Sequence, residues 1–173
     1  MKELDLGSGP HKIKGAISVD INKETNPDIV HDLNKLPLPF KSNSFDKIYM
    51  RHVLEHLNEP EKTLKDILRI AKNGAMVYIE VPHFSVYASY IMEHKRAYSC
   101  QAFKLFSNKN PNFMLKRIEL RWMRDVDLTN FARRFTNSVI NFFANLNYHL
   151  CERIWCYWVG GFGEIRVWYE IKK

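Results

Sequence analysis

A glycine turn and two acids near the start of the chain have the types and spacing that nucleoside binding needs. The turn is Gly7-Ser8-Gly9, and Asp20 and Asp32 follow it at the ends of two short apolar segments. Glycine permits backbone dihedrals that bring a ligand close to the main chain. A carboxylate accepts hydrogen bonds from ribose hydroxyls or from the exocyclic amine of adenine. The ordered set predicts a nucleoside cleft.

Two common phosphate-binding motifs are excluded by the same residues. The dinucleotide fingerprint GxGxxG requires a third glycine and an acid about 20 residues further on. Lys12 stands where that glycine would be, and Asp20 follows Gly7 by only thirteen residues. The sequence also contains no GxxxxGK[ST] motif, which excludes a P-loop.

The elements that must position these residues alternate in the first half of the chain. Apolar runs predict strands over residues 4–6, 16–20, 28–33, 45–50 and 75–81. Leu64, Ile67, Leu68 and Ala71 lie at helical spacing, which predicts a helix that begins near Asn58 and is capped by Gly74. Strands that alternate with helices or short crossovers predict an α/β, Rossmann-like, doubly wound and mostly parallel sheet. Ligands of such sheets bind beyond the carboxyl ends of the strands.

The second half is less regular. Residues 86–106 are predicted to be partly helical, and residues 113–122 and 164–171 to be strands. A helical stripe of apolar residues follows the first of these strands: Phe131, Phe135, Val139, Phe142, Phe143, Leu146, Leu150 and Ile154. Such a stripe is typical of core or partner-helix packing.

The motifs together resemble a known family. "LDLGSGP", "SVDI" and "VHDLNKLPLPFKSNSFDKIYMRHVLEHL" occur in the order found in seven-stranded, class I S-adenosylmethionine-dependent methyltransferases. The resemblance covers residues 3–83 and implies an antiparallel last strand. It implies one methyltransferase domain over 1–173, with a cofactor-binding half (1–83) and a substrate or lid half (84–173).

The resemblance also assigns roles to residues around the cofactor S-adenosylmethionine. It places Gly7, Ser8 and Gly9 along the methionine portion, Asp20 on the ribose, Ile21 against the adenine, Asp32 and Leu33 at the adenine edge, and Arg51 and His52 near the methyl group. Asp5 joins this set by orienting the glycine loop. Nine residues between Gly9 and Val19 leave room for a first crossover of one turn or less. With the chain starting at strand one, we expect an open pocket that a lid or a partner closes.

Methyl transfer to an oxygen requires alignment and is helped by removal of a proton, which histidine performs near neutral pH. His83, directly after the fifth strand, and His94 are the candidate bases, and a hydrogen-bonded structural histidine is the alternative for each. Lys95, Arg96 and Tyr98 are predicted to face the acceptor from a lid formed by residues 86–106. The reaction predicted is methylation of a hydroxyl or carboxylate on a small or glycan-type acceptor.

Metal binding is not predicted from the sequence. His52 and His56 are spaced i, i+4, as zinc ligands on a helix would be. Glu55 between them does not complete HExxH, and no cysteine or third histidine is suitably spaced in the sequence.

Charge and cysteine content bear on partners. The net charge is +7, and ten lysines and arginines stand against four acids between Glu93 and Arg134. This basic stretch indicates either a solvated surface or a docking face for an anionic acceptor. An RNA methyltransferase and a catalytically inactive cofactor-binding subunit remain as rivals. The latter would dock a partner, or a second copy, through the aromatic helix. Three cysteines without a CxxC pair predict the cytoplasm, and no apolar run predicts a membrane span.

Overall fold

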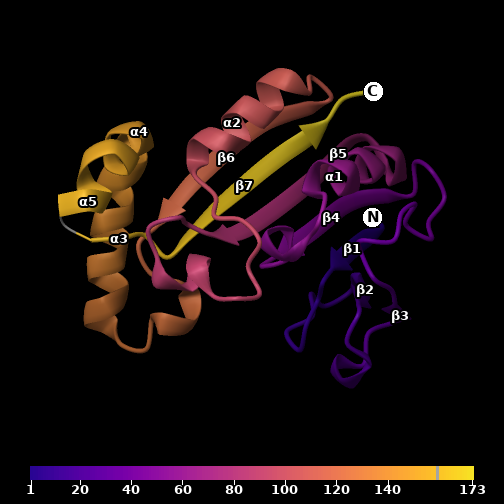
Figure 1. Ribbon diagram of the computed structural model, residues 1–173, viewed down its shortest axis with the longest axis horizontal. Coiled ribbons are helices and arrows are strands. Elements are labelled where there is room, and N and C mark those ends of the chain that lie inside the picture. Colours follow the sequence, from indigo (N-terminus) through magenta and orange to yellow (C-terminus); the bar gives the residue numbers. More distant parts are fainter. Residues whose placement is uncertain (159) are drawn as a thin grey trace.

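Seven strands form one mixed sheet in the order β3-β2-β1-β4-β5-β7-β6 (Figure 1). The computed structural model describes residues 1–158 and 160–173. The strands are β1 (Glu3–Leu6), β2 (Ile17–Asp20), β3 (Ile29–Val30), β4 (Phe45–Arg51), β5 (Ala71–Pro82), β6 (Phe113–Arg121) and β7 (Glu164–Ile171). β1 to β5 run parallel, and β7 is antiparallel to β5 and β6. The predicted α/β, Rossmann-like sheet with an antiparallel last strand is confirmed.

The helices lie mainly in the second half of the chain. They are α1 (Pro60–Ile70), α2 (Cys100–Lys109), α3 (Phe131–Leu146) and the short α4 (Tyr148–Leu150) and α5 (Cys156–Trp158), with a π-helical turn at Cys151–Trp155 between the last two. Residues 7–16, all of which the structure describes, contain turns and no helix, so the first crossover is as short as predicted. Within residues 1–158 and 160–173, no helix is both long and apolar enough to cross a membrane.

One predicted helix boundary is wrong. α1 ends at Ile70, not at Gly74, because Ala71 is already extended and pairs with Phe45 of β4. Gly74 has a φ of +78° and lies within β5, where the pairing register with β4 shifts before it resumes at Met76. Glycine is suited to this position because it adopts positive φ without a side-chain clash.

The predicted strand over residues 28–33 is reduced to the two residues of β3. Side-chain hydrogen bonds replace the ladder at both ends. Asp28 Oδ2 accepts from the Ser18 backbone N–H (2.8 Å), and Asp32 Oδ1 accepts from the Asn34 N–H (2.9 Å). A local side-chain bond such as that between Asp32 and Asn34 favours a turn over a strand.

The core lies on one face of the sheet. Leu4, Ile48 and Val77 from neighbouring strands are fully buried there, under α1 and α2. α2 is fixed to this face by Tyr169 of β7, whose hydroxyl donates to the Phe103 carbonyl oxygen (2.8 Å). The opposite face is covered less. Its aromatic side chains, Tyr49, Tyr78 and Trp168, remain partly exposed, because the short crossovers from β1 to β3 place no helix there.

α3 packs against the edge of the sheet beside β6 (Figure 1). Three asparagines at i, i+4 and i+8 accept backbone N–H groups at the end of β6: Asn145 from Leu120 (2.7 Å), Asn141 from Trp122 (2.8 Å) and Asn137 from Met123 (3.1 Å). The polar stripe of α3 therefore faces the protein. The apolar stripe faces outward, with Phe131 82% exposed, which contradicts the interpretation of this stripe as core.

Candidate active site

The glycine loop after β1 is fixed to the end of β2. The backbone N–H groups of Gly7 and Ser8 both donate to the Val19 carbonyl oxygen (2.7 and 3.1 Å), and Gly9 N–H donates to Asp20 Oδ2 (2.8 Å). Gly7 has a φ of +67°, and a Cβ placed there would lie 2.1 Å from Val53 Cγ2. Only glycine fits this position, which explains the short side-chain-poor turn at the start of the chain.

The loop borders a cavity of about 320 Å³ at the ends of β2 and β3, called the β2 cavity below. Its walls include seven of the residues predicted to bind the cofactor or to lie beside it: Gly7, Gly9, Asp20, Ile21, Asp32, Leu33 and His52. Ile21 is 65% exposed and offers the cavity a flat apolar surface. Asp20 is held in place by the N–H groups of Gly9 and Asn22, both at 2.8 Å. The structure thus brings these predicted residues together.

Asp32 also lines the β2 cavity as a carboxylate. The Asn34 backbone and side-chain amides bond to its Oδ1, and the pKa of Asp32 is lowered chiefly by the backbone hydrogen bond. Asp5, in contrast, is fully buried below the loop. It accepts from Ile13 N–H in the first crossover (3.0 Å) and pairs with Arg51 (3.1 Å), and its orienting of the glycine loop stays a prediction.

A second cavity, the central cavity, has a volume of about 520 Å³ and lies on the other side of the glycine loop. Ser8, Arg51 and His52, which the resemblance assigns to the methionine side of the cofactor, line it. Charged residues that sequence reasoning missed complete the wall: Glu80, Glu164, Arg166, Arg124 and Asp125. In the sequence, Glu80 was the one indication of a charged wall here, because it is a carboxylate inside the apolar run of β5.

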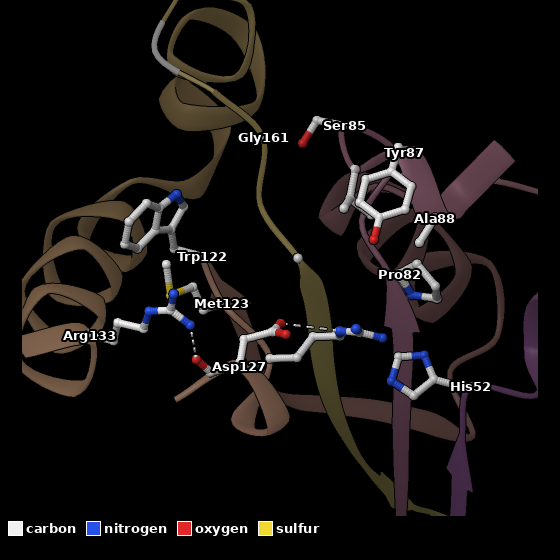
Figure 2. A pocket seen from close by; sticks show the side chains of 13 residues that line it. His52, Pro82, Ser85, Tyr87, Ala88, Trp122, Met123, Asp127, Arg133 and Gly161 are labelled. Atoms are coloured by element: carbon white, nitrogen blue, oxygen red, sulfur yellow. Dashed lines mark hydrogen bonds and ion pairs between the residues drawn. The ribbon is translucent and has the colours of Figure 1, made fainter. Parts of the chain in front are cut away.

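The third or outer cavity, of about 550 Å³, lies beyond the end of β5. Figure 2 shows Trp122, Met123 and Arg133 on one wall and Ser85 and Tyr87 on the opposite wall, with His52 at one end. The Arg133 guanidinium donates to the Asp127 carbonyl oxygen at 3.3 Å. An aromatic and cationic wall of this kind suits a small acceptor that carries negative charge.

His52 lines all three cavities. It has a φ of +53°, and its ring lies among three carboxylates: Nδ1 is 3.5 Å from Glu55, and Nε2 is 3.2 Å from Glu80 and 3.7 Å from Glu164. Burial alone would lower the pKa of His52. The neighbouring carboxylates of Glu164, Glu55 and Glu80 stabilise the charged imidazole, outweigh burial and raise the pKa to about 11. His52 is therefore a cation at neutral pH and not a proton acceptor.

Glu80 and Glu164 both lie beside this cation. Burial would raise the pKa of Glu80, but His52, Tyr78 and Arg166 together lower it to about 2. Arg166 pairs with Glu80 (3.3 Å), Glu164 (2.5 Å) and Asp125 (2.7 Å). The central cavity is thus walled by fixed charges of both signs, which can orient a zwitterionic ligand.

Neither candidate base lies on a wall of the three cavities. His83 is fully buried, with Nδ1 2.7 Å from the Ser85 hydroxyl and Nε2 3.2 Å from Glu152. Glu152 also accepts from the Cys100 backbone N–H, and despite burial its pKa is lowered by the hydrogen bonds from His83 and Cys100. This geometry is that of a structural histidine. His94 lies beside Glu55, and burial lowers the pKa of its imidazole.

The three residues predicted to face the acceptor, Lys95, Arg96 and Tyr98, form hydrogen bonds within the protein. Arg96 donates to the carbonyl oxygens of Leu57 and Asn58 (2.6 and 2.7 Å), and Lys95 Nζ donates to Asn58 Oδ1 (2.5 Å). Tyr98 donates to the Leu54 carbonyl oxygen at 3.3 Å. Their polar groups therefore fasten residues 95–98 to the segment after β4 and do not line the outer cavity. Arg133 and Arg124 supply the positive charge there instead.

The role of His83 can be tested by substitution. We expect His83→Ala to destabilise the protein by about 3 kcal/mol, because it leaves the buried carboxylate of Glu152 without its partner. Turnover of the folded fraction should stay close to that of the parent protein. Urea denaturation and activity at low temperature measure the two effects, with the surface variant His149→Ala as control. A hundredfold fall in turnover of folded protein would restore His83 as the base.

Comparison with known proteins bears on the family of the chain. Residues 12–79 match a family described as a methyltransferase domain. A demethylmenaquinone methyltransferase of Renibacterium salmoninarum is 35% identical over 137 residues; the match covers 68% of this chain, and the chain spans 56% of that relative's length.

Solved structures share the fold. In the complex between the Haloferax volcanii Trm112 methyltransferase activator and a methyltransferase, one chain matches with a TM-score of 0.67 at 17% identity, covering 99% of this chain and 82% of that one. A SAM-dependent methyltransferase from Archaeoglobus fulgidus matches with a TM-score of 0.62 at 19% identity, covering 98% and 85%. The chain belongs to the class I, Rossmann-like S-adenosylmethionine-dependent methyltransferases.

Proposed function

We propose that the protein transfers a methyl group from S-adenosylmethionine to a hydroxyl or carboxylate of a small or glycan-type acceptor. The observation that carries the proposal is the position of His52 on the walls of three adjoining cavities. A nucleoside fits the β2 cavity, an amino-acid portion the charged central cavity, and an acceptor the outer cavity. The chain spans 56% of the length of the Renibacterium relative, and we do not propose demethylmenaquinone as its acceptor.

The residues on the β2 and central cavities fit the cofactor. Asp20 is placed for the ribose hydroxyls, and the exposed Ile21 for one face of the adenine. The Ser8 hydroxyl is buried and, within the described part of the chain, has no hydrogen-bond partner, so a ligand group at the loop would satisfy it. When bound, S-adenosylmethionine supplies an activated methyl group on a positively charged sulfur.

The chain's own residues then align the acceptor. Arg124 and Arg133 on the outer cavity attract an anionic acceptor, and Trp122 and Tyr87 offer ring surfaces. A carboxylate acceptor is already ionised at neutral pH and needs no protein base. This agrees with the placement of His83 and His94 away from the outer cavity. Alignment at about 3–3.5 Å and exclusion of water then account for catalysis.

Cofactor binding provides a direct test. We expect Asp20→Ala to weaken binding of S-adenosylhomocysteine about a hundredfold, because two charge-assisted hydrogen bonds of about 1.5–3 kcal/mol each are lost. Calorimetry on folded protein measures the change. Glu24→Ala, an exposed carboxylate four residues away, is the matched control and should bind like the parent. Unchanged affinity in Asp20→Ala would remove Asp20 from the ribose site.

A second candidate is a cofactor-binding subunit that acts with a partner, and one observation favours it. The outward stripe of α3 continues into a cavity of about 530 Å³ with an almost wholly apolar wall that includes Val139, Phe143, Leu150 and Trp155. Exposed apolar surface of this extent marks interaction sites. One structural neighbour was solved with a methyltransferase activator. Turnover by the isolated chain separates the two candidates, and light scattering shows whether the stripe joins two copies.

The remaining proposals concern RNA and location. RNA as acceptor stays the less favoured alternative, and salt-dependent RNA binding would support it. We propose the cytoplasm as the location, which the three free cysteines Cys100, Cys151 and Cys156 support.

A further inference from the structure

A buried carboxylate beside the cleft lacks hydrogen bonds. Glu55 lies in the 3₁₀ turn Leu54–His56 directly after β4, and its side chain is 1% exposed. Among the described residues, neither of its carboxylate oxygens has a hydrogen-bond partner. Burying an ionised carboxylate without such partners is costly unless a cation compensates it. The His52 cation is 3.5 Å away but is shared with Glu80 and Glu164.

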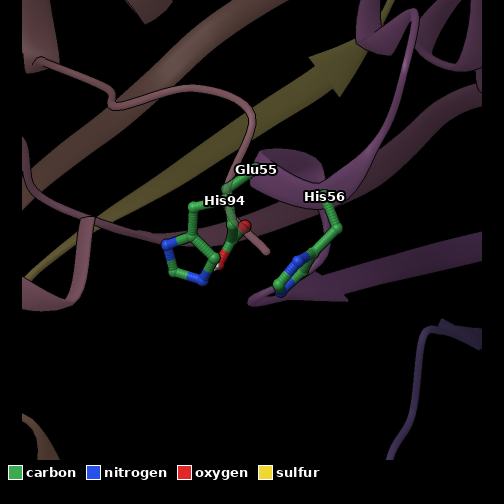
Figure 3. A group of neighbouring side chains, drawn as sticks. All are labelled: Glu55, His56 and His94. Atoms are coloured by element: carbon green, nitrogen blue, oxygen red, sulfur yellow. Dashed lines mark ion pairs between the residues drawn. The ribbon is translucent and has the colours of Figure 1, made fainter. Parts of the chain in front are cut away.

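Two further imidazoles converge on Glu55. Figure 3 shows His56 and His94 beside its carboxylate, with His94 Nε2 4.0 Å from Glu55 Oε1 and the two ring centroids 4.6 Å apart. One potential ligand atom from each of the three residues lies within 4.8 Å of the other two. A metal site at His56 is not predicted from the sequence, because no cysteine or third histidine lies at a suitable spacing. The fold supplies that group from His94, far along the chain.

The ring of His56 is oriented as that of a metal ligand. Its Nδ1 lies 3.0 Å from the Glu93 carbonyl oxygen. A histidine that binds a metal through one nitrogen usually donates its other N–H to a carbonyl or carboxylate, which fixes the tautomer. This bond engages Nδ1 and leaves Nε2 of His56 as the nitrogen that can bind a metal.

The segment that carries His94 is held in place by several bonds. Lys95 N–H donates to the Glu55 carbonyl oxygen (2.9 Å), and Arg96 donates to Leu57 and Asn58. The two segments that would supply the ligands are thus joined before any ion binds. This gives the Lys95–Arg96 pair a positioning role that the sequence does not reveal.

We propose that Glu55, His56 and His94 bind one divalent transition-metal cation. Two imidazoles and one carboxylate suit zinc, iron or manganese and leave coordination positions open. His56 also lines the β2 cavity, so the ion would lie at the border of the cofactor cleft. The other cluster, His52 with Glu80 and Glu164, is a poorer site because Arg166 already pairs with both carboxylates. The proposal does not depend on the methyltransferase reaction.

Metal binding is tested on chelator-stripped protein from which any histidine tag has been removed. Titration with Co²⁺, followed by visible absorption and calorimetry, should show one equivalent bound, and Zn²⁺ should displace it and raise the thermal midpoint. His94→Ala and Glu55→Gln should each weaken Co²⁺ binding at least tenfold and abolish the Zn²⁺-dependent thermal shift. His149→Ala is the control and should behave like the parent.

The two proposals can fail separately, because binding of S-adenosylhomocysteine is measured on the same stripped protein. His94→Ala, a substitution in the segment before α2 and outside the sheet, covers the case in which Glu55→Gln does not fold. Absence of stoichiometric Co²⁺ binding by folded parent protein would overturn the metal site. Equal binding by parent protein and folded His94→Ala would overturn it as well.

Discussion

Replacing Gly7 by alanine is expected to destabilise the protein by about 2–4 kcal/mol and to reduce cofactor affinity at least tenfold. Two costs add at this position. A side chain at positive φ costs about 1 kcal/mol, and a Cβ at 2.1 Å from Val53 Cγ2 forces the loop or the segment after β4 to shift. Because the loop is bonded to Val19 and Asp20, that shift would reach the β2 cavity.

Gly9 provides the matched control. It also has positive φ, but a Cβ there would meet no atom within 4 Å. Gly9→Ala should therefore cost only about 1 kcal/mol. Urea denaturation and calorimetry with S-adenosylhomocysteine compare the two variants. Val53→Ala in the Gly7→Ala background should recover part of the loss; equal behaviour of the two glycine variants would contradict the steric argument.

Replacing His52 by asparagine is expected to lower kcat/KM about a hundredfold or more. Asparagine tolerates the positive φ of this position, so the substitution removes the cation while keeping the backbone conformation. Without that cation, Glu80 and Glu164 are left with Arg166 as a charged partner, and the wall of the central cavity becomes more negative. The fixed charge pattern on the cavity wall is then lost, an effect typically worth 10²–10³ in rate.

Initial rates across acceptor and cofactor concentrations measure this effect. His149→Asn, a histidine on α4 away from the three cavities, is the control and should retain activity. Circular dichroism verifies that His52→Asn is folded. Activity of folded His52→Asn within a few-fold of the parent would show that the charge at the junction of the cavities is dispensable.

The cofactor end of the fold was predictable because its signals are local. A glycine turn follows β1, and an acid follows β2, so sequence order alone places Gly7, Gly9 and Asp20 at one edge of the sheet. The short first crossover follows from counting residues between Gly9 and Val19. Each of these arguments uses neighbours in the sequence, and the structure agrees with each.

The charged wall of the central cavity was not predictable in this way. It depends on which strand ends lie side by side: Glu80 of β5 and Glu164 of β7 meet His52 only because β7 inserts beside β5. His83 likewise pairs with Glu152, a residue far away in the sequence. Its position after a strand indicated a cleft residue, whereas its contacts are those of the core.

The orientation of α3 could not be predicted from the sequence, for a different reason. Its sequence contains two stripes at helical spacing, one of phenylalanines and one of asparagines. Periodicity shows that a helix is two-sided but does not show which side packs inward. A free strand edge presents N–H groups that asparagine side chains can satisfy, so here the polar side packs inward.

The asparagines of α3 also bear on aggregation. An unpaired strand edge is a template for strand addition by another molecule, and proteins commonly cover such edges. Asn137, Asn141 and Asn145 occupy the hydrogen-bonding groups at the end of β6 without extending the sheet. A partner that binds the phenylalanine side must therefore leave α3 in place. If α3 were pulled away, the edge of β6 would be exposed, and β6 strands of two copies of the protein could pair with each other.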